Sequence, residues 1–145
     1  MTDATAFEAA EHAADPEFTL YLLMRNDLAS MNPGKACAQA HHAGTQVALK
    51  DWKTWSTKHQ NWFGKWQQQA DGFGTVLCMG VNERVMRRVL EVASKINVPH
   101  GVIHDPTYPL LDGDSFHLIP LDTCAYVFGP KALLAAATHA LDLHP

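Results

Sequence analysis

Long hydrophobic runs are absent from this sequence of 145 residues. A helix that crosses a membrane needs about 20 consecutive apolar residues, and no run here approaches that length. The first sixteen residues are acidic and lack the basic stretch that opens a secretory signal. We therefore expect a cytoplasmic protein with no membrane partner, and an acidic N-terminal arm over residues 1–16 that is flexible or forms a short helix.

Cysteine is scarce and irregularly spaced. The sequence contains three cysteines: Cys37, Cys78 and Cys124. They form no C-x-x-C pair and no zinc-type spacing, so free thiols in a reducing compartment are the expected state. The adjacent histidines His41 and His42 point about 100° apart on a helix and do not easily share one ion. His104-Asp105 is only a single pair, so we expect no metal and no cofactor.

Basic residues are also few. Eleven lysines and arginines stand against fifteen acidic residues, and the formal net charge is −4. Proteins that bind nucleic acid usually show a basic balance or a basic patch. We therefore expect no DNA partner, and any contact with RNA has to come from local clustering of a few basic side chains.

What the sequence does contain is an alternation of apolar strand-like runs and helical segments. The expected strands span residues 18–24, 75–79, 100–105 and 123–128, and the expected helices span residues 35–49, 83–96 (capped by Asn82) and 131–141. Such alternation predicts a mainly parallel sheet, with at least one antiparallel pair where a loop replaces a helix. The expected fold class is α/β: a single domain, residues 17–145, with a small four-stranded mixed β-sheet flanked by helices.

Two stretches stand outside this alternation. Residues 106–120 contain three prolines, and we expect a long irregular loop of the kind that is usually functional or mobile. All the tryptophans lie within residues 50–69, at helical spacing: Trp52, Trp55, Trp62 and Trp66. They fit a platform that stacks RNA bases between lysines, or an amphipathic helix whose aromatic stripe packs on the core. We favour core packing.

The first expected strand passes into the first expected helix through a polar turn. Asn32, Pro33 and Gly34 block a helix, and Lys35 then opens an alanine-rich segment. Ligands of open α/β sheets bind beyond the carboxyl ends of the strands, where a helix N-terminus favours an anion. Lys35 is therefore a candidate for phosphate contact or acid–base chemistry, although a solvent-exposed lysine at a helix start fits the same pattern.

The residues around this turn form a longer pattern. In order they are Arg25-x-Asp27-Leu28, Met31, Gly34-Lys35, Ala38-Gln39 and His42-Ala43. This pattern resembles the N-terminal signature of the peptidyl-tRNA hydrolase family of the archaeal and eukaryotic type, and the spacing of the residues is the same. Weaker matches follow at Trp66, Ile103-x-Asp105 and Gly129-Pro130, so the resemblance covers roughly residues 18–141.

The resemblance implies a four-stranded α/β core and an activity that recycles tRNA during translation. Members hydrolyse the ester between a peptide and the terminal ribose of tRNA, so the implied partner is peptidyl-tRNA. The family is often dimeric, which makes a homodimer one expected state. The implied substrate-binding residues are Arg25, Asp27, Gly34, Gln39 and His42.

The resemblance also implies catalytic roles for Lys35 and Asp105. Hydrolysis of an ester needs a positioned water and stabilisation of the developing oxyanion. An aspartate can orient or activate the water, and a lysine can stabilise the oxyanion or bind the neighbouring phosphate. Neither role needs a metal. Without the resemblance, a carboxylate that caps a loop is the better interpretation of Asp105, and a half-buried packing histidine fits His42 equally well.

Two threonines assist catalysis in the family, and here they match less directly. The first family position holds Pro109, which leaves Thr107, two residues earlier, as the candidate. The second position falls on Cys124, unless a one-residue bulge aligns Thr123 with it. A cysteine in a strand is far more often buried and inert than nucleophilic.

Three functions therefore remain open. The leading one is a peptidyl-tRNA hydrolase-like ester hydrolase. The altered residues after Asp105, the acidic 106–120 segment and the negative net charge also fit a non-catalytic binding or regulatory module of the same fold. A hydrolase of a smaller ester without tRNA fits these features too.

Overall fold

The computed structural model describes residues 15–145, so residues 1–14 of the expected N-terminal arm lie outside the described residues.

The central strand of the sheet is β1 (Phe18–Arg25), whose residues are all buried. Its continuous apolar sequence suits a strand that is covered on both faces. β1 pairs in parallel with β2 (Thr75–Val81) and antiparallel with β4 (Ser115–Pro130). β3 (His100–Asp112) pairs with β4, and the short β5 (Asp142–Leu143) pairs with β2.

The sheet is mixed and has five strands, in the order β3-β4-β1-β2-β5, rather than the four expected. Among these pairs only β1–β2 is parallel, so the expectation of a mainly parallel sheet is wrong. The reason is that β4 returns along β3 as a hairpin and enters the sheet between β3 and β1. The α/β fold class, with one mixed sheet flanked by helices, is confirmed.

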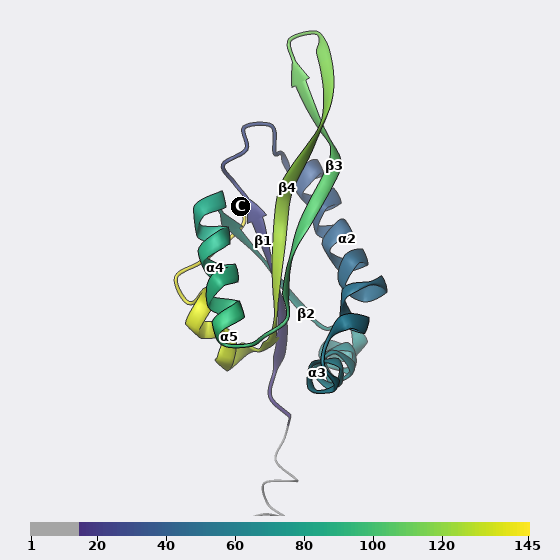
Figure 1. Ribbon diagram of the computed structural model, residues 1–145, viewed down its shortest axis with the longest axis vertical. Coiled ribbons are helices and arrows are strands. Elements are labelled where there is room, and N and C mark those ends of the chain that lie inside the picture. Colours follow the sequence, from purple (N-terminus) through teal and green to yellow (C-terminus); the bar gives the residue numbers. More distant parts are fainter. Residues whose placement is uncertain (1–14) are drawn as a thin grey trace, which may run out of the picture.

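Helices cover both faces of the sheet (Figure 1). α2 (Pro33–Leu49) and α3 (Thr57–Gln68) lie on one side, and α4 (Glu83–Lys95) and α5 (Lys131–Thr138) lie on the other. Within residues 15–145, no helix is long and apolar enough to cross a membrane.

The start of α2 differs from expectation because Pro33 and Gly34 belong to the helix instead of blocking it. Proline suits the first turn, where its missing N–H removes a donor that would have no partner in the helix. The Asn32 side chain caps the helix by accepting a hydrogen bond from the Lys35 backbone N–H at 2.8 Å. The cap fixes where the helix begins, and therefore the direction in which the side chains of Lys35, Gln39 and His42 project.

Residues 106–120 form the outer part of a β-hairpin rather than an irregular loop. β3 and β4 stay paired as far as Asp112 and Ser115, and Gly113, with a φ of 59°, begins the two-residue turn between them. The prolines misled the sequence interpretation, because Pro106 and Pro109 lie on β3, an edge strand, and such strands tolerate proline. Figure 1 shows this hairpin projecting beyond both helical layers.

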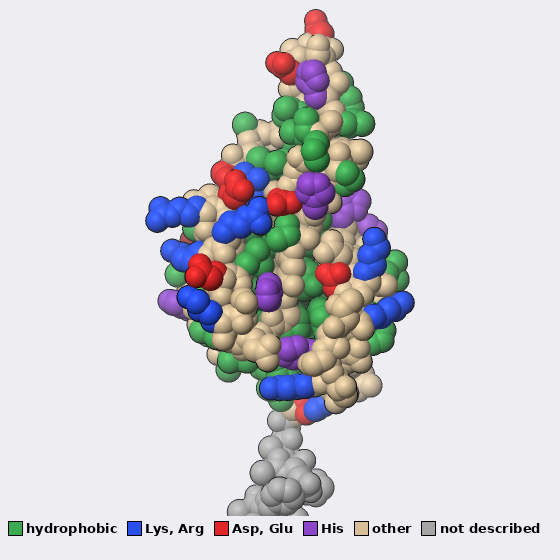
Figure 2. All heavy atoms as spheres, viewed as in Figure 1, with side chains coloured by type: hydrophobic (Ala, Val, Ile, Leu, Met, Phe, Trp, Pro, Cys, Tyr) green, Lys and Arg blue, Asp and Glu red, His purple; other side chains and the backbone are tan. Residues whose placement is uncertain are grey.

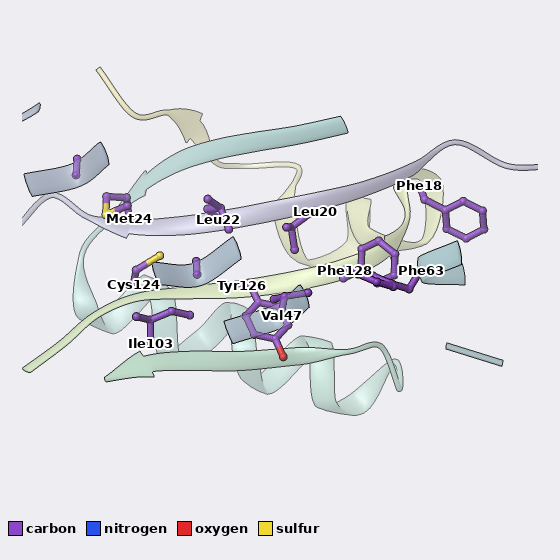
Figure 3. Packing of buried hydrophobic residues seen from close by; sticks show 12 residues of the cluster. Phe18, Leu20, Leu22, Met24, Val47, Phe63, Ile103, Cys124, Tyr126 and Phe128 are labelled. Carbon is purple, nitrogen blue, oxygen red and sulfur yellow. The ribbon is translucent and has the colours of Figure 1, made fainter. Parts of the chain in front are cut away.

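The core consists of two clusters, one on each face of the sheet. Side chains of β1 alternate between them: Leu20 and Leu22 point towards α2 and α3, while Tyr21 and Leu23 point towards α4 and α5. Figure 3 shows the first cluster, in which residues of β1, β3 and β4 meet side chains of the helices.

The tryptophans belong to this core. Trp52 lies in a short 3₁₀ turn, Asp51–Thr54, so the four do not share a single helix. All four pack against the cluster on the α2 and α3 side. Trp55 stacks on Phe128 with 5.4 Å between ring centroids, and the Trp66 indole N–H donates to the Thr75 carbonyl at 2.9 Å. These contacts support the packing interpretation.

Candidate active site

One face of α2 lies against β3 and carries three of the expected site residues. Lys35, Gln39 and His42 are four and then three residues apart, so they project to the same side of the helix. Gln46 continues this face, and its side-chain amide donates to the Val102 carbonyl of β3 at 3.1 Å. The helix therefore presents a polar face along the edge strand of the sheet.

A buried hydrogen-bond chain connects α2 to both strands of the hairpin. The Thr123 hydroxyl donates to the Gln39 side-chain oxygen at 2.6 Å, and the Gln39 amide donates to Asp105 Oδ2 at 2.8 Å. Thr123 is fully buried and Gln39 is 3% exposed. Because Thr123 donates to the oxygen of Gln39, the amide nitrogen faces Asp105, and the carboxylate is held in one position.

Thr123 reaches this position because β4 contains a bulge. Ile103 pairs with Cys124 and His104 pairs with Asp122, so Thr123 is the extra residue between them. Of the two alternatives that the sequence left open, a one-residue bulge or Cys124 in register, the bulge is present. Cys124 is fully buried, and burial raises the pKa of its thiol to about 12, so it is not a nucleophile near neutral pH.

The pKa of Asp105 lies below its ordinary value despite partial burial. Burial alone would raise this pKa, but hydrogen bonds from the Gln39 amide and the Thr107 backbone N–H, together with the nearby His42, lower it. The Thr107 N–H donates to Asp105 Oδ1 at 2.9 Å, and the Thr107 hydroxyl lies at 3.4 Å from the same oxygen. Asp105 is therefore an anion at neutral pH and a weak proton acceptor.

Lys35 is attached to the base of the hairpin. Its ammonium donates to the Pro109 carbonyl at 2.8 Å and lies 5.1 Å from the centroid of the Tyr108 ring. Tyr108 is buried, and its hydroxyl lies 3.0 Å from the Ser30 hydroxyl. Pro109, at the position where the family has a threonine, therefore contributes a backbone carbonyl to this region.

A cavity of about 340 Å³ opens beside Asp105, between α2 and β3. Three expected site residues line it: His42, Asp105 and Thr107. The other six lining residues were outside the expected set: Thr45, Gln46, Lys50, Ile103, His104 and Pro106. Gln46 could have been found by extending the Lys35–Gln39–His42 spacing one turn further along α2, and Lys50 by extending it to the residue that follows the helix.

Arg25 and Asp27 lie away from this cavity, at the end of β1 beside α4. The Arg25 guanidinium is 3.0 Å and 3.1 Å from the two Asp27 carboxylate oxygens, and it donates to the Asp122 carbonyl at 3.1 Å. Asp27 also accepts a hydrogen bond from the Glu83 backbone N–H at the start of α4. Figure 2 shows acidic and basic side chains gathered over this side of the molecule. Substrate binding by Arg25, Asp27 and Gly34 stays a prediction.

The Arg25–Asp27 pair makes stability depend on pH. The hydrogen bond from Arg25 lowers the pKa of Asp27, so this contribution is present above the ordinary aspartate pKa and is lost as pH falls through the lowered value. We expect Asp27→Asn to reduce the free energy of unfolding by about 1–2 kcal/mol at pH 7. The deficit begins to shrink below about pH 4, where Asp27 of the unfolded chain becomes protonated, and it disappears as pH falls through the lowered pKa of the folded state.

Urea unfolding of wild type and Asp27→Asn at pH 7 and pH 3 measures this dependence. Asp114→Asn, at the exposed tip of the hairpin, is the matched control and shifts the curve little at either pH. An Asp27→Asn deficit that is equal at both pH values contradicts the assignment.

Among residues 15–145, no group of three or more His, Cys, Asp or Glu side chains is placed to hold a metal ion. The polar groups around the cavity are instead a carboxylate anion, two histidines, a lysine and amide side chains. This arrangement can orient a water molecule and surround a developing negative charge. The fold and the site together describe an α/β protein with a carboxylate-centred cleft at the edge of its sheet.

Comparison with known proteins identifies the family of this chain. The family model described as "Peptidyl-tRNA hydrolase PTH2" matches residues 18–143. The chain therefore belongs to this peptidyl-tRNA hydrolase family, and the resemblance seen in the N-terminal signature is confirmed.

One curated relative carries the same name, and one solved structure has a similar fold. A protein of Staphylothermus marinus named peptidyl-tRNA hydrolase is 29% identical over 89 residues, which cover 61% of this chain and 68% of the relative. A solved structure of a protein of unknown function from Agrobacterium tumefaciens strain C58 has a TM-score of 0.53 and 10% identity. That match covers 89% of this chain and 98% of the solved chain, and it supports the fold.

Proposed function

We propose that this protein is a peptidyl-tRNA hydrolase, which cleaves the ester between a peptide and the 3′-terminal ribose of tRNA. The observation that carries the proposal is the Asp105 carboxylate, fixed by Gln39 and Thr107 at the wall of a cavity. The family match and the name of the Staphylothermus relative support the substrate class. A cytoplasmic role in recycling tRNA is part of the same proposal.

The residues divide the chemistry as follows. Asp105, an anion at neutral pH, orients the attacking water through the side of its carboxylate that faces the cavity. Lys35 has a long flexible stem, so its ammonium can leave the Pro109 carbonyl and approach the ester oxygen or the adjacent phosphate. Thr123 is buried against Gln39, so it positions Asp105 rather than contacting substrate.

A binding or regulatory module of the same fold is the second candidate. Two observations favour it: the Lys35 ammonium is engaged by the Pro109 carbonyl, and the hairpin tip carries the acidic residues Asp112 and Asp114. An acidic hairpin repels the phosphates of RNA. A small ester as substrate is a third candidate, and hydrolysis of such an ester without competition from added tRNA would favour it.

The direct test is hydrolysis of a peptidyl-tRNA by the wild type and by Lys35→Ala. We expect turnover by the wild type and a fall of about 100-fold in kcat/KM for Lys35→Ala, because removing one group that stabilises an oxyanion has an effect of this size. Raising the salt concentration from 50 to 200 mM should weaken binding of the substrate if lysines contact phosphates.

Lys95→Ala is the matched control, since Lys95 is an exposed lysine on α4 and pairs only locally with Glu91. It should retain wild-type kcat/KM. Equal turnover by wild type and Lys35→Ala would contradict the role of Lys35. Binding of peptidyl-tRNA without hydrolysis by the wild type would favour the binding module instead.

A further inference from the structure

His104 belongs to a hydrogen-bond chain that the roles above do not use. Its Nδ1 lies 2.8 Å from Asp122 Oδ1, and the other oxygen of Asp122 lies 2.6 Å from the Arg87 guanidinium. The three residues come from β3, β4 and α4. Arg87 and then His104 lower the pKa of Asp122, so this carboxyl is an anion at neutral pH.

This contact determines which nitrogen of His104 carries the proton. A carboxylate accepts hydrogen bonds and donates none, so Nδ1 must be the N–H donor of the neutral ring. The lone pair is then on Nε2, on the opposite side of the ring. A histidine held in this tautomer by an aspartate is the arrangement that serves as general base in Ser-His-Asp hydrolases.

His104 lines the same cavity as Asp105. Adjacent side chains of a strand point to opposite faces, and no α4 residue lines the cavity, so His104 borders it from the edge of the sheet, where β3 lies. The His104 side chain is 58% exposed, which leaves the ring accessible to a substrate. His104 and Asp105 therefore border one space, and Asp122 lies behind the His104 ring, outside the cavity lining.

Hydrolysis of an ester by water needs a proton acceptor. Asp105 has a lowered pKa and accepts a proton poorly at neutral pH, whereas imidazole is the side chain whose ordinary pKa lies closest to neutrality. The charged or titratable groups around His104 are Asp122 on β4, Arg87 on α4, Asp105 on β3, His42 on α2, and Lys50 directly after α2. His42 is the other histidine of the cavity, but no carboxylate of the described residues fixes its ring by a hydrogen bond.

We propose that His104, held by Asp122, is the general base of the hydrolysis, an inference that rests on the proposed function. Nε2 takes a proton from the water as the water oxygen bonds to the ester carbonyl carbon. The imidazolium returns this proton to the ribose oxygen as the bond between the carbonyl carbon and that oxygen breaks. Asp122 and Arg87 are positioning residues, which hold the ring and its tautomer.

The first experiment measures kcat and KM from pH 5 to pH 9 for wild type, His104→Gln and Asp122→Asn. We expect His104→Gln to lower kcat by about 100-fold with little change in KM, and to remove the rise of kcat across the range in which imidazole titrates. Asp122→Asn keeps the imidazole but loses its orientation, so kcat falls less than in His104→Gln and the rise of kcat with pH moves.

His117→Gln is the matched control. His117 lies on the same hairpin, 3.9 Å from Asp112, but outside the cavity lining.

Two further measurements separate this inference from the proposed function. Nitrogen-15 NMR of the histidine rings should show His104 protonated at Nδ1 in the wild type, and this preference should disappear in Asp122→Asn. Hydrolysis of p-nitrophenyl acetate, an activated ester without tRNA, should be faster for wild type and His117→Gln than for His104→Gln.

Each outcome has a defined meaning. Equal kcat and equal pH profiles for wild type and His104→Gln overturn the role of His104 while leaving the hydrolase intact. If the wild type does not hydrolyse peptidyl-tRNA, the proposed function fails, and the activated ester decides about the base. In that case, equal rates of wild type and His104→Gln on p-nitrophenyl acetate also overturn the role of His104 as general base.

Discussion

Replacing Asp105 by alanine is expected to lower kcat for peptidyl-tRNA by about 1000-fold, since the fixed carboxylate both orients the water and complements the charge of the transition state. The free energy of unfolding should change by less than about 1 kcal/mol, because Asp105 is only partly buried and water can replace its oxygens beside Gln39 and Thr107. Single-turnover hydrolysis at saturating enzyme, together with urea unfolding, measures both effects.

Asp112→Ala is the control for this prediction. Asp112 is an exposed aspartate of the same strand, at the tip of the hairpin, and its loss should leave kcat unchanged. Asp105→Asn adds a finer test, because an amide has a single acceptor oxygen and cannot accept hydrogen bonds from both Gln39 and Thr107 on two different atoms. Activity of Asp105→Ala within threefold of wild type would remove Asp105 from the catalytic residues.

The largest expected effect on stability is that of Phe128→Ala, about 3–5 kcal/mol. Phe128 is 1% exposed and lies at the centre of the aromatic packing between β4 and α3. Its ring is 5.4 Å from that of Trp55, 5.8 Å from that of Trp66 and 6.2 Å from that of Phe63, measured between centroids. Truncation leaves a cavity whose walls, made of rigid rings, collapse poorly. Guanidinium unfolding at 25 °C measures the loss.

Phe73→Ala is the same substitution at a residue that is 85% exposed. It should change the free energy of unfolding by no more than about 0.5 kcal/mol. A Phe128→Ala variant as stable as Phe73→Ala would show that the tryptophans do not form a closely packed core in solution, and it would reopen the base-stacking interpretation of this segment.

Local pattern predicted most of the elements correctly. β1, β2 and α4 were recognisable because a continuous apolar run, or an apolar stripe behind a capping Asn82, follows from the neighbours in sequence. The outer part of the β3–β4 hairpin was missed because prolines normally interrupt strands, and Pro106 and Pro109 are tolerated because β3 lies at the edge of the sheet. β5 contains two residues, too few for any periodicity.

Some residues of the candidate site could likewise be predicted from local pattern, and others could not. Lys35, Gln39 and His42 could be grouped in advance because helix geometry places them on one face. Asp105, the hydrogen-bond partner of Gln39, was named from the resemblance to the family rather than from any local pattern. Gln39 joins Asp105 to Thr123 only because β4 contains a bulge. The bulge depends on the register between β3 and β4, which no local pattern specifies.

By itself, the sequence determined the family, the α/β class, the polar face of α2 and the aspartate opposite it. These features depend on spacing within one element or on a contiguous signature, so neighbouring residues suffice to specify them. The tertiary structure decided that β4 lies between β3 and β1, that Lys35 is engaged by Pro109, and that His104 meets Asp122 and Arg87. Such contacts join residues that lie far apart in the chain, and only strand register and helix packing bring them together.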